Sequence, residues 1–172
     1  LKAIMKEIER SEGKVLLFVG RIDPLKGIDQ LIRMIPHLQN GQKRRLLIIG
    51  GDEDSRSEIA TLQELAQELK VQDLVSFLGT IKHEQLPYFY SAADLCVMPS
   101  YYESFGMVAL ESLACGTPVV ATDVGGLKSI IRQGETGYVV PDNSPQQMAD
   151  KIELFLTHPI TKPKSAMAMR ES

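Results

Sequence analysis

Two basic side chains lie in a short, turn-rich segment that directly follows an apolar run. The segment 20–27 begins with Gly20 and contains Arg21 and Lys26, and the run 15–19 before it is typical of a buried strand. Neither the glycine spacing of a dinucleotide fingerprint nor that of a P-loop is present. Two cations at the end of a strand suit a diphosphate, because Arg binds it bidentately while Lys acts as a point charge. The alternative is a pair of solvated loop charges, and this segment alone favours neither.

A second segment, residues 101–111, combines a serine, a glycine and the start of an apolar helix. Ser104 is expected to be the N-cap of that helix, and Gly106 lets a ligand approach the backbone closely. The amides of a first helical turn lack helical partners, so they form an anion site that the helix dipole reinforces. We expect these amides in Phe105, Gly106, Met107 and Val108.

Two glutamates flank this expected anion site. Glu111 lies within an apolar run, where a carboxylate is costly to bury without partners, and the two hydroxyls of a sugar diol are suitable partners. The helix rises about 4–5 Å from Val108 to Glu111, which is comparable with the step from a phosphate to a ribose. Glu103 precedes the helix and is expected to face the opposite side of the phosphates, where a transferred sugar lies. The alternative is a surface Glu103 and a Glu111 that pairs with a donor in the core.

The elements that must position these residues alternate between short apolar runs and longer helical stretches. The expected strands are 15–19, 46–49, 74–78, 95–98, 118–121 and 138–140. The expected helices are 27–38, 57–69, 86–93, 104–115, 127–132 and 145–156. Strands that are apolar on both faces and separated by helices indicate a parallel sheet covered on both sides. The fold class is therefore α/β, as a single Rossmann-like doubly wound parallel sheet of about six strands, and ligands bind such sheets at the carboxyl ends of the strands.

Length and composition favour one soluble domain. The chain has 172 residues, of which 44% are hydrophobic and 24% charged. We expect a charged helical linker stub over 1–14, the ligand-binding domain over 15–158 and a flexible tail over 159–172. The net charge of −3 gives no general attraction to nucleic acid or to an anionic membrane. The basic run 43–45 is expected to be a solvated strand entrance.

The two cysteines indicate the compartment. Cys96 and Cys115 lie in apolar segments without metal-ligand spacing, so both are expected to be buried free thiols in a reducing environment. No apolar run has the length of a transmembrane helix, and the first residues lack the form of a signal peptide. The expected localisation is therefore the cytoplasm.

The order of these segments resembles the C-terminal domain of glycosyltransferase family 4, whose members are retaining enzymes of the GT-B type. The resemblance rests on 18–21 with 26–27, on Glu103-x7-Glu111 around Ser104-Phe105-Gly106, on 114–121, and on Gly125-Gly126. It covers about 15–156, and 102–140 is most similar to the branch that contains sucrose-phosphate synthases. Ser129 departs from the pattern, because the family commonly has a glutamate there, which weakens the sub-family assignment more than the function.

The resemblance implies a role for each matching residue. Arg21 and Lys26 would bind the donor diphosphate and Glu103 the hydroxyls of the donor sugar, so these three would carry the catalysis. Glu111 would hold the ribose hydroxyls, and the backbone around Ile81 would meet the base edge. The other implied donor-binding positions are Gly20, Ser104, Phe105, Gly106, Met107 and Val108.

The implied function is the donor-binding half of a retaining glycosyltransferase. It would transfer a hexose from a nucleoside-diphosphate sugar, with a UDP-sugar as the first candidate, to an acceptor hydroxyl. Its partner would be the N-terminal acceptor-binding domain of a longer enzyme, with no contact to nucleic acid or membrane, so the chain alone is expected to be inactive. No metal is required, and Asp52-Glu53-Asp54 is expected to cap a turn rather than bind one. The alternatives are a non-catalytic sugar-nucleotide-binding module and another GT-B enzyme such as a sugar-nucleotide epimerase.

Overall fold

A single parallel sheet organises the protein. The computed structural model describes residues 1–10, 12–38 and 43–158. Within them, six strands form a sheet in the order β3-β2-β1-β4-β5-β6, and every pair is parallel. The strands are β1 (Lys14–Val19), β2 (Arg44–Ile49), β3 (Val75–Gly79), β4 (Leu95–Met98), β5 (Val119–Thr122) and β6 (Gly137–Val140). The predicted doubly wound α/β fold is confirmed. The expected tail, 159–172, lies outside the described residues.

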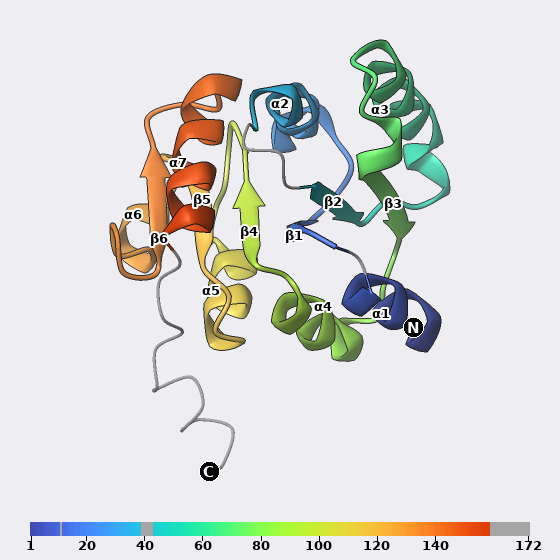
Figure 1. Ribbon diagram of the computed structural model, residues 1–172. Helices are drawn as coiled ribbons and strands as arrows, with labels where there is room; N and C mark the ends of the chain where they lie inside the picture. The colour runs from blue at the N-terminus through green and yellow to red at the C-terminus, as the bar shows by residue number, and fades with distance from the viewer. Residues whose placement is uncertain (11, 39–42, 159–172) are drawn as a thin grey trace.

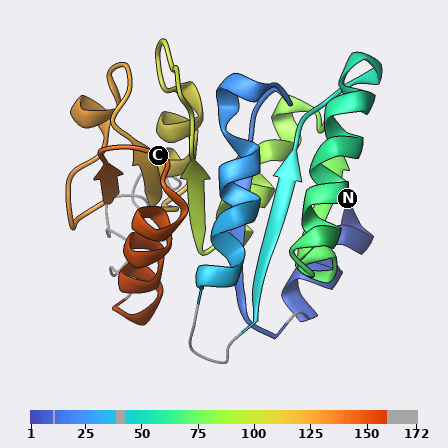
Figure 2. The ribbon, with the colours of Figure 1, turned by 90° about the horizontal axis from the view of Figure 1, so that it is seen from above.

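Helices cover both faces of the sheet (Figure 1). One face carries α2 (Ile28–Met34), α3 (Arg56–Glu68) and α7 (Pro145–Thr157). The other carries α1 (Lys2–Arg10), α4 (Leu86–Ala92), α5 (Met107–Ala114) and α6 (Leu127–Ile130). Figure 2 shows α7, α2 and α3 side by side in front of the sheet. Short 3₁₀ turns complete the connections: η1 (Pro24–Lys26), η2 (Ile35–His37), η3 (Glu53–Ser55), η4 (Gln72–Leu74) and η5 (His83–Gln85).

The continuous apolar runs follow from this two-sided cover. Side chains alternate across a strand, so Leu16 and Phe18 enter the core under α2 and α3, while Leu17 enters the core under α4 and α5. Leu17 also pairs in register with Leu47 on one side and Cys96 on the other. Each strand therefore needs apolar residues at consecutive positions rather than at alternate ones.

The expectation that the basic run 43–45 is solvated is wrong for Arg44. Its side chain is 4% exposed, and its Nε and Nη2 donate to the two carboxylate oxygens of Glu153 on α7, at 3.2 and 3.1 Å. A buried guanidinium requires such a partner, because an unpaired buried charge is costly. The ion pair of Arg44 with Glu153 thus joins the start of β2 to the last helix, α7.

Both cysteines are free thiols, as expected, but the expectation that both are buried is wrong for Cys115. Cys96 is a buried free thiol and Cys115 a half-buried one. Burial raises the pKa of Cys96 to about 12, so this thiol stays protonated at neutral pH. Among the described residues, no helix is both long and apolar enough to span a membrane.

The strand order fixes where a ligand can bind. The chain runs outward from β1 through β2 to β3, and then returns to place β4 on the other side of β1. The loops that follow β1 and β4 therefore depart from neighbouring strands and turn to opposite faces of the sheet. Doubly wound sheets bind ligands in the crevice beyond the carboxyl ends of the strands at such a switch point.

Candidate functional site

The two loops predicted to carry chemistry meet at the switch point. The backbone N–H of Tyr101, after β4, donates to the carbonyl of Leu25, after β1, at 2.9 Å. Beside this contact, Lys26 Nζ lies 3.1 Å from Glu103 Oε2. The two side chains are only 19% and 15% exposed, so the ion pair is largely enclosed. The structure thus brings together two of the three residues expected to carry the catalysis.

Arg21, the third, lies at the rim of the site. Its side chain is 82% exposed and pairs with Asp23 at 3.5 Å. Asp23 also accepts a hydrogen bond from the Leu25 amide, which starts η1 and turns the chain toward Lys26. Lys26 is therefore the enclosed cation of this loop, and Arg21 is an exposed one.

The backbone around Glu103 is held from two directions. Ser100 is buried, its hydroxyl lies 3.5 Å from Glu103 Oε2, and its carbonyl accepts a hydrogen bond of 2.5 Å from Thr122 at the end of β5. On the other side, a Cβ added at Gly125 would lie 2.1 Å from the Glu103 carbonyl oxygen. Gly125 has a φ of +57°, so both its conformation and its close approach to Glu103 require glycine.

The prediction of Ser104 as the N-cap of α5 is wrong. The helix begins at Met107, and Gly106, at a φ of 65° in the left-handed region, takes the cap position without a side-chain hydrogen bond. A residue without a Cβ is suited to this position, because one added there would lie 2.7 Å from Leu127 Cδ2. Since the Leu110 amide is the first to bond back, to the Gly106 carbonyl at 3.1 Å, the orphan amides start at Met107 and Val108. Phe105 therefore precedes the helix.

Glu111 has two partners from other elements. Its Oε2 accepts a hydrogen bond of 2.9 Å from the hydroxyl of Tyr90 on α4, and its Oε1 lies 3.0 Å from His83 Nε2 in η5. Tyr90 is buried, whereas the His83 side chain is 82% exposed. Burial raises the pKa of Tyr90 above its usual value, with the hydrogen bond to Glu111 adding to the shift, so the phenol is a neutral donor.

The contact with His83 connects Glu111 to the loop that follows β3. That loop contains Ile81, which is half-buried and packs against the core under α4. Glu111 therefore faces the side of the crevice toward β3, whereas Glu103 faces the loop after β1. The two glutamates occupy different ends of the candidate site, with the start of α5 between them in the chain.

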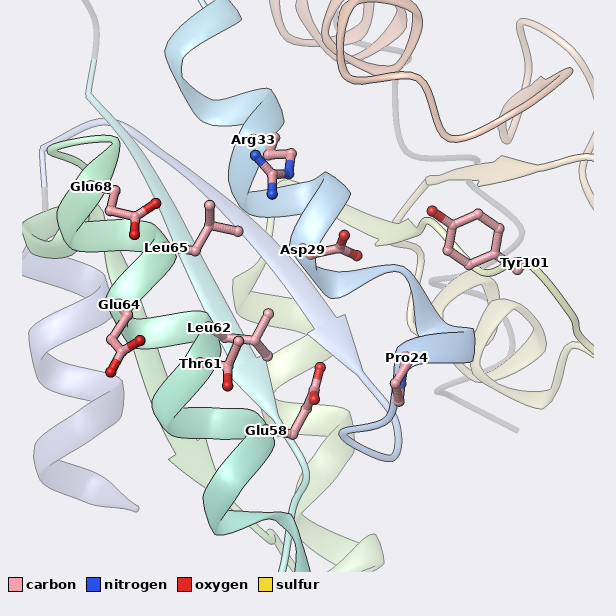
Figure 3. A pocket seen from close by; sticks show the side chains of 10 residues that line it. All are labelled: Pro24, Asp29, Arg33, Glu58, Thr61, Leu62, Glu64, Leu65, Glu68 and Tyr101. Carbon is pink, nitrogen blue, oxygen red and sulfur yellow. The ribbon is translucent and has the colours of Figure 1, made fainter.

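Two other groups of charged residues do not offer a diphosphate site. A groove of about 450 Å³ lies between α2 and α3, with Pro24 and Tyr101 at one end (Figure 3). Its charged lining is acidic except for one guanidinium: Asp29, Glu58, Glu64, Glu68 and Arg33. Four carboxylates against one cation repel a diphosphate.

The acidic triplet after β2 has a structural role, as expected. Asp52 accepts from the Asp54 amide and forms a capping box with Ser55 at the start of η3. In the part of the chain that the structure describes, no cluster of three or more His, Cys, Asp or Glu side chains is arranged to hold a metal ion.

Sequence reasoning missed the contacts by which several residues support the site. Tyr90, His83, Ser100 and Thr122 act through contacts across 21, 28, 3 and 22 positions of the chain. Only Ser100 is near the residue it supports, and a serine at the end of a strand has no distinctive pattern. The others become visible only when α4, η5 and β5 are placed in the fold.

Comparison with known proteins gives the family. Residues 2–172 match the family described as Glycosyl transferases group 1. A D-inositol 3-phosphate glycosyltransferase of Acidothermus cellulolyticus is 46% identical over 151 residues, which cover 84% of this chain and 34% of that protein. A second one, from Mycobacteroides abscessus, is 45% identical over 144 residues, which cover 83% of this chain and 32% of that protein. The chain thus spans about a third of the length of these relatives.

Solved structures agree with this assignment. Sucrose-phosphate synthase from Thermosynechococcus elongatus superposes with a TM-score of 0.81 at 39% identity, over 92% of this chain and 40% of that one. The C-terminal domain of a group 1 family protein, LpcC, from Francisella tularensis superposes with a TM-score of 0.76 at 28% identity, over 90% of this chain and 81% of that domain. The fold is therefore that of one Rossmann-like domain of a GT-B protein, and the chain belongs to the group 1 glycosyltransferases.

Proposed function

We propose that this chain binds the nucleoside-diphosphate sugar for a retaining glycosyltransferase that moves a hexose to an acceptor hydroxyl. The observation that carries the proposal is the enclosed contact of 3.1 Å between Lys26 and Glu103 at the switch point. It supports the proposal because a cation suited to a phosphate and a carboxylate suited to sugar hydroxyls lie together, at the edge where sheets of this kind bind ligands. The donor lies across this edge, with its base toward Ile81 and its sugar toward Glu103.

The diphosphate binds between the two loops. The Lys26 ammonium has three donors, so it can keep its contact with Glu103 while it also donates to a phosphate oxygen. The orphan amides of Met107 and Val108 at the start of α5 add two backbone donors and the positive end of the helix dipole. Arg21, exposed at the rim, reaches the phosphates by leaving Asp23.

The two glutamates bind the two sugars of the donor. Both described contacts of Glu103 use Oε2, so Oε1 is available to accept from a hydroxyl of the transferred hexose. Glu111 accepts from the ribose hydroxyls, on the side of the crevice where the loop after β3 meets the base. Each carboxylate thus has a protein partner, Lys26 or Tyr90, and also contacts the ligand.

Catalysis follows from where charge develops. Cleavage of the bond between the sugar carbon and the phosphate oxygen builds negative charge on the diphosphate and positive charge on the sugar ring. Lys26, Arg21 and the amides of α5 stabilise the first, and preorganised donors of this kind contribute much of the rate enhancement in many enzymes. The acceptor attacks from the face of the leaving group, a phosphate oxygen takes its proton, and the configuration at the sugar carbon is retained.

The acceptor binds outside this domain. The chain corresponds to 34% of the length of its relative from Acidothermus cellulolyticus, and we assign the acceptor to an N-terminal domain of a longer enzyme. The partners are then the donor and that domain. This chain alone binds donor and transfers no sugar, and enzyme-like transfer by the isolated chain would contradict this division.

Calorimetry tests the function directly. The chain is titrated with UDP, GDP and ADP, each with and without a chelator, and then with the sugar conjugate of the preferred nucleotide. We expect one of these diphosphates to bind, with UDP as the first candidate, and the chelator to leave the affinity unchanged. If none of the three nucleotides binds, the proposed function is wrong. If the chelator abolishes binding, only the metal-independent phosphate site is wrong.

A further inference from the structure

We propose that Tyr90 is a positioning residue, which fixes the carboxylate of Glu111 in the orientation that receives the ribose hydroxyls. This inference rests on the proposed function, because it concerns how the ribose end of that site is built. Tyr90 touches no ligand in this account. It acts through its hydrogen bond to Glu111 Oε2, at 2.9 Å.

Tyr90 is held rigidly at both of its polar ends. The side chain is among the largest fully buried ones, with 1% of its surface exposed. Its backbone carbonyl accepts a hydrogen bond from the hydroxyl of Thr117, itself fully buried. The carbonyl of Thr117 in turn accepts from Ser112 on α5, at 2.9 Å. Tyr90 thus bonds through its hydroxyl to Glu111 on α5, and through its backbone to the loop that follows this helix.

A buried phenol gives a hydrogen bond with a fixed direction. Since burial keeps Tyr90 neutral, its hydroxyl keeps the proton that it donates to Glu111 Oε2. A free glutamate side chain loses conformational entropy when a ligand orders it. The hydrogen bond from Tyr90 orders Glu111 before the ligand arrives, so less of that entropy is lost on binding.

The two partners of Glu111 mark its buried side and its solvent side. Tyr90 contacts Oε2 from the core, whereas His83, 82% exposed, contacts Oε1 from outside. A ligand enters from solvent, so it meets the oxygen that His83 covers. An exposed pair of this kind contributes little to stability and is readily displaced. The buried contact is the one that persists when the nucleotide is bound.

The test compares Tyr90→Phe with Tyr88→Phe. Both variants lose one hydroxyl from α4, but Tyr88 is 58% exposed, so its variant is the matched control. Affinity is measured by calorimetry for UDP and for 2′,3′-dideoxy-UDP, which lacks both ribose hydroxyls. The ratio of the two affinities reports the hydroxyl contacts alone. We expect this ratio to fall roughly three- to tenfold in Tyr90→Phe, and to stay at the wild-type value in Tyr88→Phe.

Glu111→Ala separates failure of the inference from failure of the function. We expect it to remove most of the preference for UDP, and Tyr90→Phe combined with Glu111→Ala to lower the ratio no further. If Glu111→Ala removes the preference and Tyr90→Phe retains it, the positioning role is wrong and the ribose site stands. Equal loss of affinity for both ligands in Tyr90→Phe would likewise overturn the inference, because a merely structural role predicts that result. If Glu111→Ala keeps the full preference for UDP over 2′,3′-dideoxy-UDP, the assignment of Glu111 to the ribose in the proposed function is wrong.

Discussion

Lys26 Nζ lies 3.1 Å from Glu103 Oε2, across 77 positions of the chain and between the loops that follow β1 and β4. The cation and the carboxylate pair with each other, so neither is an unpaired buried charge. Ser100 and Gly125 hold the carboxylate side of this pair in place. The ion pair therefore fixes both side chains, and under the proposed function a nucleotide sugar contacts both of them at once.

Comparing Lys26→Met with its double variant Lys26→Met/Glu103→Gln separates the effect on nucleotide affinity from the effect on stability. We expect Lys26→Met to lower the free energy of unfolding by about 1–2 kcal/mol, because Glu103 is left largely enclosed without its cation. The double variant with Glu103→Gln recovers part of that loss, since the unpaired charge is gone. Affinity for the nucleoside diphosphate falls by about tenfold or more in both, measured by calorimetry. Wild-type affinity in Lys26→Met would remove Lys26 from the phosphate site.

The cap of α5 predicts that Gly106 contributes to stability and that Ser104 contributes little. Gly106→Ala forces a side chain into the left-handed region and toward Leu127, so we expect a loss of about 1–2 kcal/mol in urea unfolding. Ser104→Ala changes stability by less than about 0.5 kcal/mol, because Ser104 makes no capping hydrogen bond. A larger loss for Ser104→Ala than for Gly106→Ala would mean that the helix begins earlier in solution.

The glycine pair before α6 offers a matched comparison. A Cβ at Gly125 lies 2.1 Å from the Glu103 carbonyl oxygen, whereas one at Gly126 has nothing within 4 Å. We expect Gly125→Ala to displace the Glu103 loop and to abolish any gain in affinity that the sugar adds to the bare nucleotide. Gly126→Ala retains that gain. The measurement is the affinity ratio of the nucleotide sugar to the nucleoside diphosphate, and equal ratios in the two variants would contradict the close approach.

The sequence predicted the sheet because each strand is a short apolar run between turn signals. The run 95–98 coincides with β4, and 15–19 differs from β1 by one residue. The two loops at the switch point were also predictable, since parallel strands alternating with helices fix which ends of the strands meet. Lys26 and Glu103 could therefore be placed at one edge from the sequence, although not in contact with each other.

The remaining details depend on contacts between distant segments. The sequence favours a solvated Arg44, because nothing near it in the chain indicates an ion pair with Glu153, which is 109 positions away. Ser104 was expected to cap α5, because serine and glycine both suit an N-cap, and only the packing of Leu127 against Gly106 decides between them. The support of Glu111 by Tyr90 was missed for the same reason, since an aromatic residue in an apolar helix normally predicts core packing alone.

The two glutamates test which end of the nucleotide sugar lies at which end of the site. Glu111→Ala should weaken the binding of the bare nucleoside diphosphate and of its sugar conjugate alike, because the ribose is present in both ligands. Glu103→Ala should spare the nucleoside diphosphate and weaken only the sugar conjugate. Each loss should be about 1.5–3 kcal/mol in binding free energy, with melting temperatures recorded separately to account for changes in stability.

One calorimetric experiment therefore decides the account: the wild type and these two variants, each titrated with the nucleoside diphosphate and with its sugar conjugate. We expect the affinity ratio of the two ligands to be unchanged in Glu111→Ala and reduced in Glu103→Ala. If both variants lose the same affinity for both ligands, the orientation of the donor along the edge from Glu111 to Glu103 is wrong.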